Sequence, residues 1–138
     1  MPLERPVNLA IEYVERLNRR DFTGLAEVMS PDHRLLPGGK DVVLGRAAAC
    51  KSLSGYVSSW PEFQIHVSDV YLIGNTVALV ARTTGSCAQL TREEEIRDRR
   101  LYGAKVVNGL VEEFRYYEED TPQLREALGV TSASRITP

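Results

Sequence analysis

The last predicted strand, Gly109 to Asp120, combines carboxylates with aromatic rings. Side chains alternate across a strand. One face therefore carries Glu112, Phe114, Tyr116 and Glu118. Burial beside aromatic rings raises the pKa of a glutamate into a range useful for proton transfer. Glu112 and Glu118 are therefore candidate acid–base groups, and the alternative is that both are solvated near the strand ends.

Two arginines and a tyrosine share one parity on the preceding strands: Arg82, Arg100 and Tyr102. If they converge, their donors form a cationic patch suited to a carboxylate, phenolate or enolate. The alternative is an outward ladder of salt bridges with Glu113 or Glu119. The register decides between them, because a slip of one residue moves every side chain to the other face.

The two histidines of the chain, His33 and His66, lack paired ligand spacing, so no metal site is predicted. His33 begins a short strand and could reach a pocket or cap a turn. His66 alternates with apolar neighbours, which places it on the outer face of a sheet. Trp60 ends a predicted helix, where an aromatic ring packs in the core or lines a ligand site.

The elements that must position these residues follow from apolar periodicity and turn residues. Apolar residues at helical spacing predict helices over 6–20, 22–29 and 47–60, and Thr121-Pro122 begins a further short helix. Strands are predicted over 33–36, 63–73, 76–87 and 98–107, before the last strand. Asn108-Gly109 is a strong hairpin signal. Helices segregated from an antiparallel sheet predict an α+β domain.

Composition limits the remaining possibilities. The 138 residues fit one domain, predicted over 1–129, with a loose polar tail over 130–138. The net charge of −2, with both signs interspersed, does not indicate a nucleic-acid partner. We expect a cytoplasmic protein, because no apolar run has the length of a membrane span and the first residues lack secretory-signal features. Cys50 and Cys87 are expected to be free thiols.

Three strings resemble the nuclear transport factor 2-like superfamily, and within it the SnoaL-like polyketide cyclase group. They are YVERLNRRDFTGLAEVMSPDH at Tyr13–His33, VLGRAAA at Val43–Ala49 and NGLVEEFRYYEED at Asn108–Asp120. The resemblance covers about Val7 to Gly129. It implies a cone-shaped α+β barrel, in which a strongly curved, mostly antiparallel sheet wraps against three N-terminal helices and leaves a pocket at its open end. Members include cyclases, isomerases, epoxide hydrolases, dehydratases and non-catalytic binding modules.

Only some catalytic positions of the families that this chain resembles have a matching residue here. Tyr13 resembles the oxyanion-hole tyrosine of ketosteroid isomerases, whose phenol donates to a developing enolate, and its alternative is a packed tyrosine. The general-base position of those enzymes falls near Pro37, and their second oxyanion-hole acid falls near Tyr102. Against the epoxide hydrolase pattern, Arg82 matches, whereas Thr84 and Tyr116 replace acids. Steroid isomerisation and epoxide hydrolysis are therefore not assigned.

The sequence thus predicts a cofactor-independent pocket enzyme that acts by proton transfer on a hydrophobic, oxygenated metabolite such as a polyketide. Its reaction would be a cyclisation, an isomerisation or a dehydration. The predicted catalytic groups are Tyr13, Tyr102, Glu112 and Glu118, and the predicted ligand contacts are His33, Trp60, Arg82, Thr84, Arg100, Phe114 and Tyr116. The alternative is a non-catalytic binding or assembly module. A homodimer through the outer sheet face, with Val111, Arg115 and Tyr117, is expected in either case.

Overall fold

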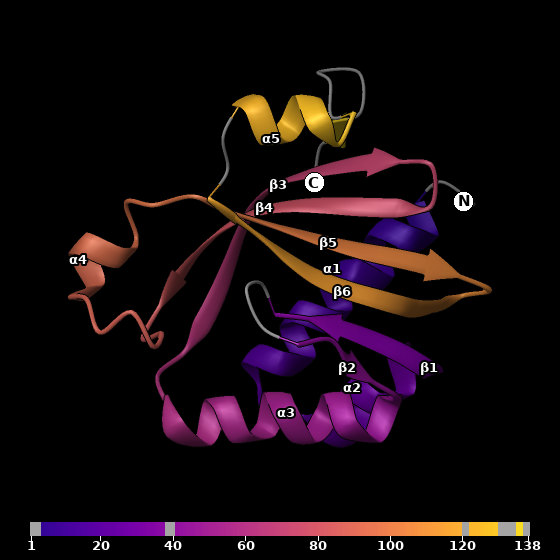
Figure 1. The fold of residues 1–138 in the computed structure, drawn as a ribbon, viewed down its shortest axis with the longest axis horizontal. Coiled ribbons are helices and arrows are strands. Elements are labelled where there is room, and N and C mark those ends of the chain that lie inside the picture. The colour runs from indigo at the N-terminus through magenta and orange to yellow at the C-terminus, as the bar shows by residue number, and fades with distance from the viewer. Residues whose placement is uncertain (1–3, 38–40, 120–121, 130–134, 137–138) are drawn as a thin grey trace.

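Helices and strands segregate in this chain, which a computed structural model describes over residues 4–37, 41–119, 122–129 and 135–136 (Figure 1). The helices are α1 (Glu4–Asn18), α2 (Phe22–Val28), α3 (Arg46–Ser59), α4 (Arg92–Glu95) and α5 (Pro122–Ala127). The strands are β1 (Met29–Leu36), β2 (Val43–Leu44), β3 (Gln64–Ile73), β4 (Thr76–Thr84), β5 (Arg100–Val107), β6 (Leu110–Glu119) and β7 (Arg135–Ile136). The predicted α+β class is confirmed.

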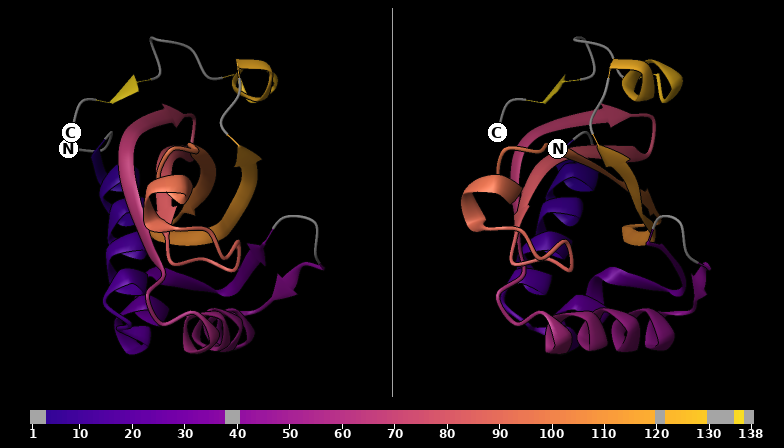
Figure 2. Two further views of the ribbon diagram at one scale, coloured as in Figure 1. Left: turned by 90° about the vertical axis from the view of Figure 1, so that its left-hand side faces the viewer. Right: turned by 60° about the vertical axis from the view of Figure 1, so that its left-hand side comes forward.

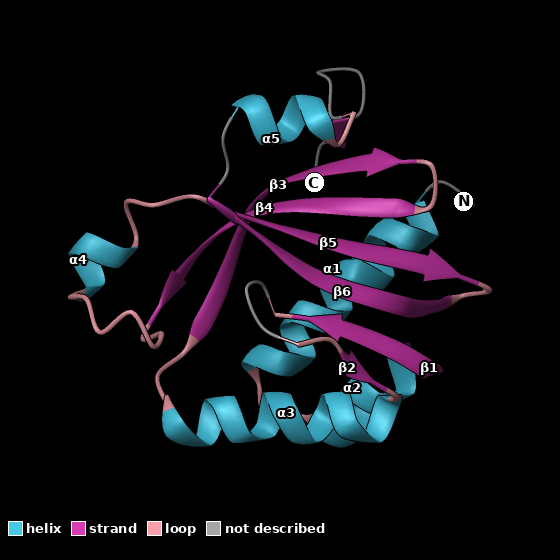
Figure 3. Cartoon of the chain, viewed as in Figure 1, coloured by secondary structure: helices cyan, strands magenta, loops and turns pink. Residues whose placement is uncertain are grey.

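The strands form one open, mixed sheet in the order β2-β1-β6-β5-β4-β3-β7 (Figure 3). The pair β1–β6 is parallel, and the other described pairs are antiparallel. The sheet is neither closed nor strongly curled, which differs from the predicted cone-shaped barrel. The two-residue strands β2 and β7 occupy opposite edges of the sheet and do not pair with each other, so the described strands leave it open.

The face of the sheet that packs against α1, α2 and α3, called the inner face, holds the main core. Helix α1 contributes an apolar stripe because Val7, Ala10, Val14 and Leu17 recur at helical spacing, and all four are buried. Each fully buried large aliphatic side chain stabilises the fold by about 1.5–3 kcal/mol. The bounds of α1, α2 and α3 agree closely with the helices predicted over 6–20, 22–29 and 47–60.

The opposite, outer face has a smaller core, which packs against Leu128, the residue that follows α5. Figure 2 shows α5 on the far side of the sheet from α1. Arg125 of α5 donates from Nη1 to the hydroxyl of Tyr71 at 2.9 Å. The Tyr117 ring lies over Gly103, where a Cβ atom would stand 2.6 Å from the ring. Glycine is therefore required at position 103 for this ring to cover the strand.

A β-bulge at Glu112 changes which face each β6 residue occupies. Val106 pairs with Val111, but Lys105 pairs with Glu113, so Glu112 is an extra residue. Val111 and Phe114 consequently both lie in the inner core, although they differ in parity. The prediction that Val111 points outward is wrong for this reason.

Element boundaries differ from the prediction mainly at the sheet edges. Strand β1 begins at Met29 rather than at residue 33, and β2 falls outside every predicted strand. Within the tail predicted as loose, residues 135–136 pair with β3, while 130–134 and 137–138 lie outside the described residues. None of the helices in the described ranges is long and apolar enough to cross a membrane.

Candidate functional site

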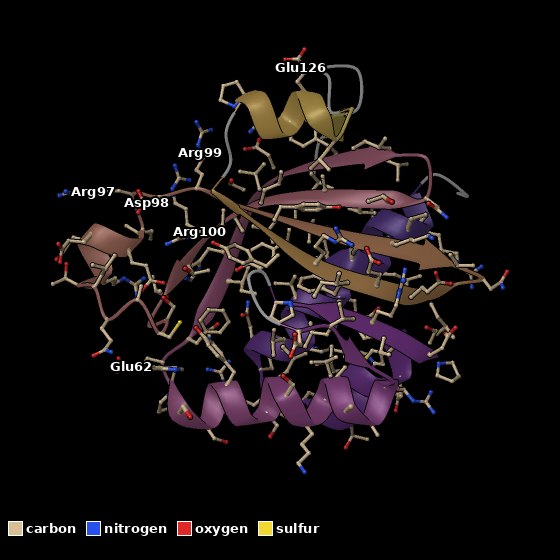
Figure 4. The ribbon with its side chains drawn as sticks, in the orientation of Figure 1. Glu62, Arg97, Asp98, Arg99, Arg100 and Glu126 are labelled. Atoms are coloured by element: carbon tan, nitrogen blue, oxygen red, sulfur yellow. The ribbon has the colours of Figure 1, made fainter. Side chains whose placement is uncertain are left out.

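Polar side chains gather on the inner face where β4 ends and β5 begins. Tyr56, Glu95, Arg100, Tyr102 and Tyr116 influence one another electrostatically there, and they are called the inner polar cluster. They come from α3, α4, β5 and β6. Figure 4 shows Arg100 at this end of the sheet, after Arg97, Asp98 and Arg99, which spread outward from the preceding segment. Residues distant in sequence thus form one candidate site.

Arg100 and Tyr116 are the directly bonded pair of the cluster. Arg100 donates from Nη1 to the Tyr116 hydroxyl oxygen at 3.2 Å, which leaves the Tyr116 hydrogen available to a ligand. Burial lowers the pKa of Arg100, but nearby Tyr116 and Asp98 outweigh this effect and raise it. Arg100 is therefore charged, and the pair offers charge-assisted donors of the kind that stabilise a developing oxyanion.

Tyr102 lies beside this pair and is almost fully buried. Its ring centroid is 5.2 Å from that of Tyr116 and 5.7 Å from that of Phe114. Burial, and then the neighbouring Tyr116, raise the pKa of Tyr102. The phenol is therefore protonated at neutral pH and acts as a donor rather than as a base.

Glu95 is a fully buried carboxylate whose two oxygens are both engaged. Thr83 donates its hydroxyl to Oε2 at 2.5 Å, and the backbone N–H of Ser86 donates to Oε1 at 3.2 Å. Burial raises the pKa of Glu95, but these hydrogen bonds and the charge of Arg100 outweigh it and lower the pKa. Glu95 is consequently an ionised, satisfied group and a poor proton acceptor.

Tyr56 closes the cluster from the side of α3. Its hydroxyl oxygen accepts a hydrogen bond from the backbone nitrogen of Cys87, 3.0 Å away, and burial raises the pKa of Tyr56 to about 12. Phe63 packs edge-on against its ring, with 5.0 Å between centroids. Trp60, the residue at the end of α3, is half-buried against the same core.

Tyr13 is not available to a ligand, because its hydroxyl is bonded to His33. His33 Nδ1 lies 2.8 Å from the carbonyl oxygen of Val111, and a carbonyl only accepts, so Nδ1 carries the hydrogen. Tyr13 then donates to Nε2 at 3.1 Å. Both side chains have no exposed surface, and Phe114 stacks on Tyr13 with 4.3 Å between centroids. Burial raises the pKa of Tyr13 and lowers that of His33, so both are neutral.

Arg82 and Thr84 lie on the outer face, away from the inner polar cluster. Arg82 pairs with His66, and His66 Nε2 lies 3.0 Å from the Thr84 hydroxyl. The predicted convergence of Arg82 with Arg100 fails because β5 pairs Arg100 with Ala81. An irregular connection between two strands does not conserve residue parity, so shared parity carries no information about a shared face. The predicted outward position of His66 is confirmed.

The predicted acids of β6 also separate from the cluster. Glu112 lies 3.5 Å from Lys105 Nζ on the outer side, because the two residues of a bulge oppose one partner residue. Beside it, Glu113 bonds Arg34 at 2.7 Å and lies 3.5 Å from Arg115. An open hollow of about 630 Å³ adjoins Glu112, lined also by Asp32, Arg34, Leu44 and Gly45. The backbone of Glu118 pairs with Leu101, and its side chain lies outside the described residues.

Two cluster members carry no functional signal in the sequence. Tyr56 fits the apolar spacing of a helix, so the sequence indicates only a core residue, and its half-buried ring agrees with that interpretation. Glu95 follows the capping box that Thr91 and Glu94 form at the start of α4, and no local signal separates it from the adjacent exposed acids. No cluster of three or more potential metal ligands occurs within the described ranges.

A comparison with known families shows to which family the chain belongs. The family profile described as SnoaL-like domain matches residues 10–119. The chain belongs to the SnoaL-like domain family. This match spans most of the chain and includes α1 from Ala10 onward, the sheet up to β6 and every member of the inner polar cluster. No individually curated protein matches this SnoaL-like chain significantly.

Solved structures resemble the SnoaL-like chain in fold. A proposed polyketide cyclase from Sinorhizobium meliloti is 13% identical with a TM-score of 0.69, covering 79% of this chain and 93% of that one. A proposed ketosteroid isomerase from Kribbella flavida is 24% identical with a TM-score of 0.64, covering 91% and 88%. A de novo designed protein with a curved β-sheet is 18% identical with a TM-score of 0.67, covering 94% and 95%. Since a designed protein matches as well as these two, the similarity shows the fold alone.

Proposed function

We propose that this SnoaL-like protein binds a hydrophobic, oxygenated metabolite at the inner polar cluster and promotes proton transfer on it without a cofactor. The bond from Arg100 to Tyr116 is the observation that carries the proposal, because it places a charged and a neutral donor side by side next to the ring of Tyr102. A ligand carbonyl held there would be polarised toward an enolate. Isomerisation, dehydration and aldol cyclisation all pass through such a species.

Each group has a distinct role in this proposal. Arg100 stabilises negative charge on the ligand oxygen, and Tyr116 and Tyr102 donate hydrogen bonds. Trp60 and Phe63 provide apolar contact near the cluster. The sequence predicts Glu118 as the proton acceptor, but its backbone pairs with Leu101 of the outer core, so the proposal assigns this role to none of the described members of the cluster.

The first test uses 2-naphthoate and 2-acetylnaphthalene as probes of an oxygenated aromatic ligand. Tyr116→Phe, which removes only a hydroxyl, is expected to weaken binding about tenfold, the effect of about 1.4 kcal/mol from one lost charge-assisted hydrogen bond. Titration calorimetry measures the affinity. Tyr117→Phe is the matched control, because Tyr117 lies in the outer core and its variant should bind as the unmodified protein does. Equal weakening by both variants, or no binding of either probe, contradicts the site.

A non-catalytic binding module is the second candidate, and one observation favours it. Tyr13 and His33, which could have served proton transfer, are bonded to each other beneath Phe114. Exchange of the methyl protons of 2-acetylnaphthalene with D2O, followed by NMR, separates the two candidates. An enzyme accelerates this exchange and loses the acceleration in Tyr116→Phe, whereas a binding module leaves the exchange at its background rate.

We also propose a homodimer through the outer face of β1, β6 and β5. Charges of both signs intersperse there on Arg34, Lys105, Glu112, Glu113 and Arg115, a pattern that can complement itself across a two-fold axis. Light scattering is expected to give twice the chain mass of 15.4 kDa, and Arg115→Glu is expected to shift the protein toward monomer. A monomer at high protein concentration would remove the proposal.

A further inference from the structure

Residues 86–99, which belong to the connection from β4 to β5 that carries α4 (Figure 1), are called the rim segment because they adjoin the inner polar cluster. Its residues from Cys87 to Glu94 are all exposed. Glu95 is the fully buried residue of the segment, and its side chain is a carboxylate. The rim segment is therefore held to the sheet at this point by polar bonds rather than by an apolar anchor.

Two sets of hydrogen bonds attach the rim segment to the cluster. Glu95 accepts from Thr83, an inner-face residue at the end of β4, and from the N–H of Ser86. At the same turn, the N–H of Cys87 donates to Tyr56. The segment then runs directly into Arg100, whose side chain bonds Tyr116. Both ends of the segment thus adjoin members of the inner polar cluster.

The chemistry of this attachment indicates more than packing. Burying a carboxylate is costly, and an apolar residue of similar volume often gives equal or greater stability at such a position. An apolar side chain at position 95 could not accept the hydrogen bonds from Thr83 and Ser86, which hold the rim segment to the sheet a few residues before Arg100. The charge of Arg100 also lowers the pKa of Glu95, in keeping with an ionised carboxylate near that guanidinium. The bonds from Thr83 and Ser86 fix where that carboxylate stands.

We propose that Glu95, fixed by Thr83, is a positioning residue that holds the rim segment closed and orients Arg100 and Tyr56 toward the ligand. The proposal rests on the ligand site proposed above. Glu95 itself does not touch the ligand, because both of its oxygens are already engaged. Loss of the Thr83 hydroxyl would leave the fold of the sheet intact and release the rim.

The test compares Thr83→Val, which keeps the shape but removes the hydroxyl, with Thr83→Ser, which keeps the hydroxyl. Glu93→Gln is the control, because Glu93 is an exposed acid of the same helix. In the ligand-free protein, Thr83→Val is expected to speed hydrogen exchange of the rim-segment amides about tenfold and to shift the side-chain N–H signal of Arg100 in NMR spectra. Affinity for 2-naphthoate should fall about fivefold. Thr83→Ser should restore all three readouts, and Glu93→Gln should change none.

The outcomes distinguish the positioning role of Glu95 from the ligand-site proposal on which it rests. If the unmodified protein binds neither probe, the ligand site fails, while the exchange and Arg100 readouts still decide the role of Glu95. Unchanged exchange and an unchanged Arg100 signal in Thr83→Val overturn the positioning role, as does an equal effect of Glu93→Gln. Glu95→Gln provides a second variant, expected to behave as Thr83→Val does.

Discussion

Replacing His33 with alanine is expected to lower the free energy of unfolding by about 3 kcal/mol, one of the two largest effects predicted for this chain. The substitution opens a cavity in a fully buried position. It also leaves the Tyr13 hydroxyl and the Val111 carbonyl without their partner. Tyr13→Phe, which removes only the donor to Nε2, should cost about 1–2 kcal/mol. Urea denaturation followed by circular dichroism measures both losses.

The other histidine provides the control. His66 is exposed on the outer face, so His66→Ala should change stability by no more than about 0.5 kcal/mol. If His33→Ala is as mild as His66→Ala, the bonded pair of Tyr13 and His33 does not stabilise the fold. Tyr13 would then regain its place as a candidate donor to the ligand.

The same pair makes stability depend on pH. Burial lowers the pKa of His33 in the folded protein below its ordinary value of 6.5. Between the two values the unfolded chain binds more protons than the folded one, so stability falls as the pH decreases below about 6.5. His33→Ala should lose this part of the pH dependence, whereas His66→Ala should retain it. A stability profile measured between neutral and mildly acidic pH tests the sign.

Gly85→Ala is the second large effect, expected at about 3 kcal/mol from two separate causes. The backbone at Gly85 has φ of 68°, which is unfavourable for any residue with a Cβ atom. A Cβ atom there would also stand 2.6 Å from the carbonyl carbon and oxygen of Glu62, which are backbone atoms and cannot turn aside. Calorimetric unfolding gives the change in stability.

Gly74 separates these causes, because it shares only the first of them. Its φ is 63°, but a Cβ atom would meet nothing within 4 Å. Gly74→Ala should therefore cost only about 1 kcal/mol and leave probe binding unchanged. Gly85→Ala, next to the rim segment, should also weaken binding of 2-naphthoate. Equal losses of stability in the two variants would show that the contact with Glu62 is relieved by a small movement.

Local patterns are sufficient to predict most elements of this fold. The apolar stripe of α1 predicts both the helix and its buried face, because helical periodicity is a property of the segment itself. Asn108 and Gly109 predict the β5–β6 hairpin correctly, and both adopt the positive φ values that such a turn requires. The strings at residues 13–33 and 108–120 likewise indicate the SnoaL-like family. Each string is continuous, so it can be recognised without knowing which distant residues are in contact.

The sequence by itself therefore determined the α+β class, the order of the main elements and the family. Only the tertiary structure decided which side chains meet, because pairing register and bulges depend on contacts between distant segments. The bulge at Glu112 moved that carboxylate to the outer face, and the Ala81–Arg100 pairing separated Arg100 from Arg82. The position of Tyr13 in the sequence indicated a candidate donor to a ligand. In the structure its hydroxyl instead donates to His33, twenty residues away, inside the core.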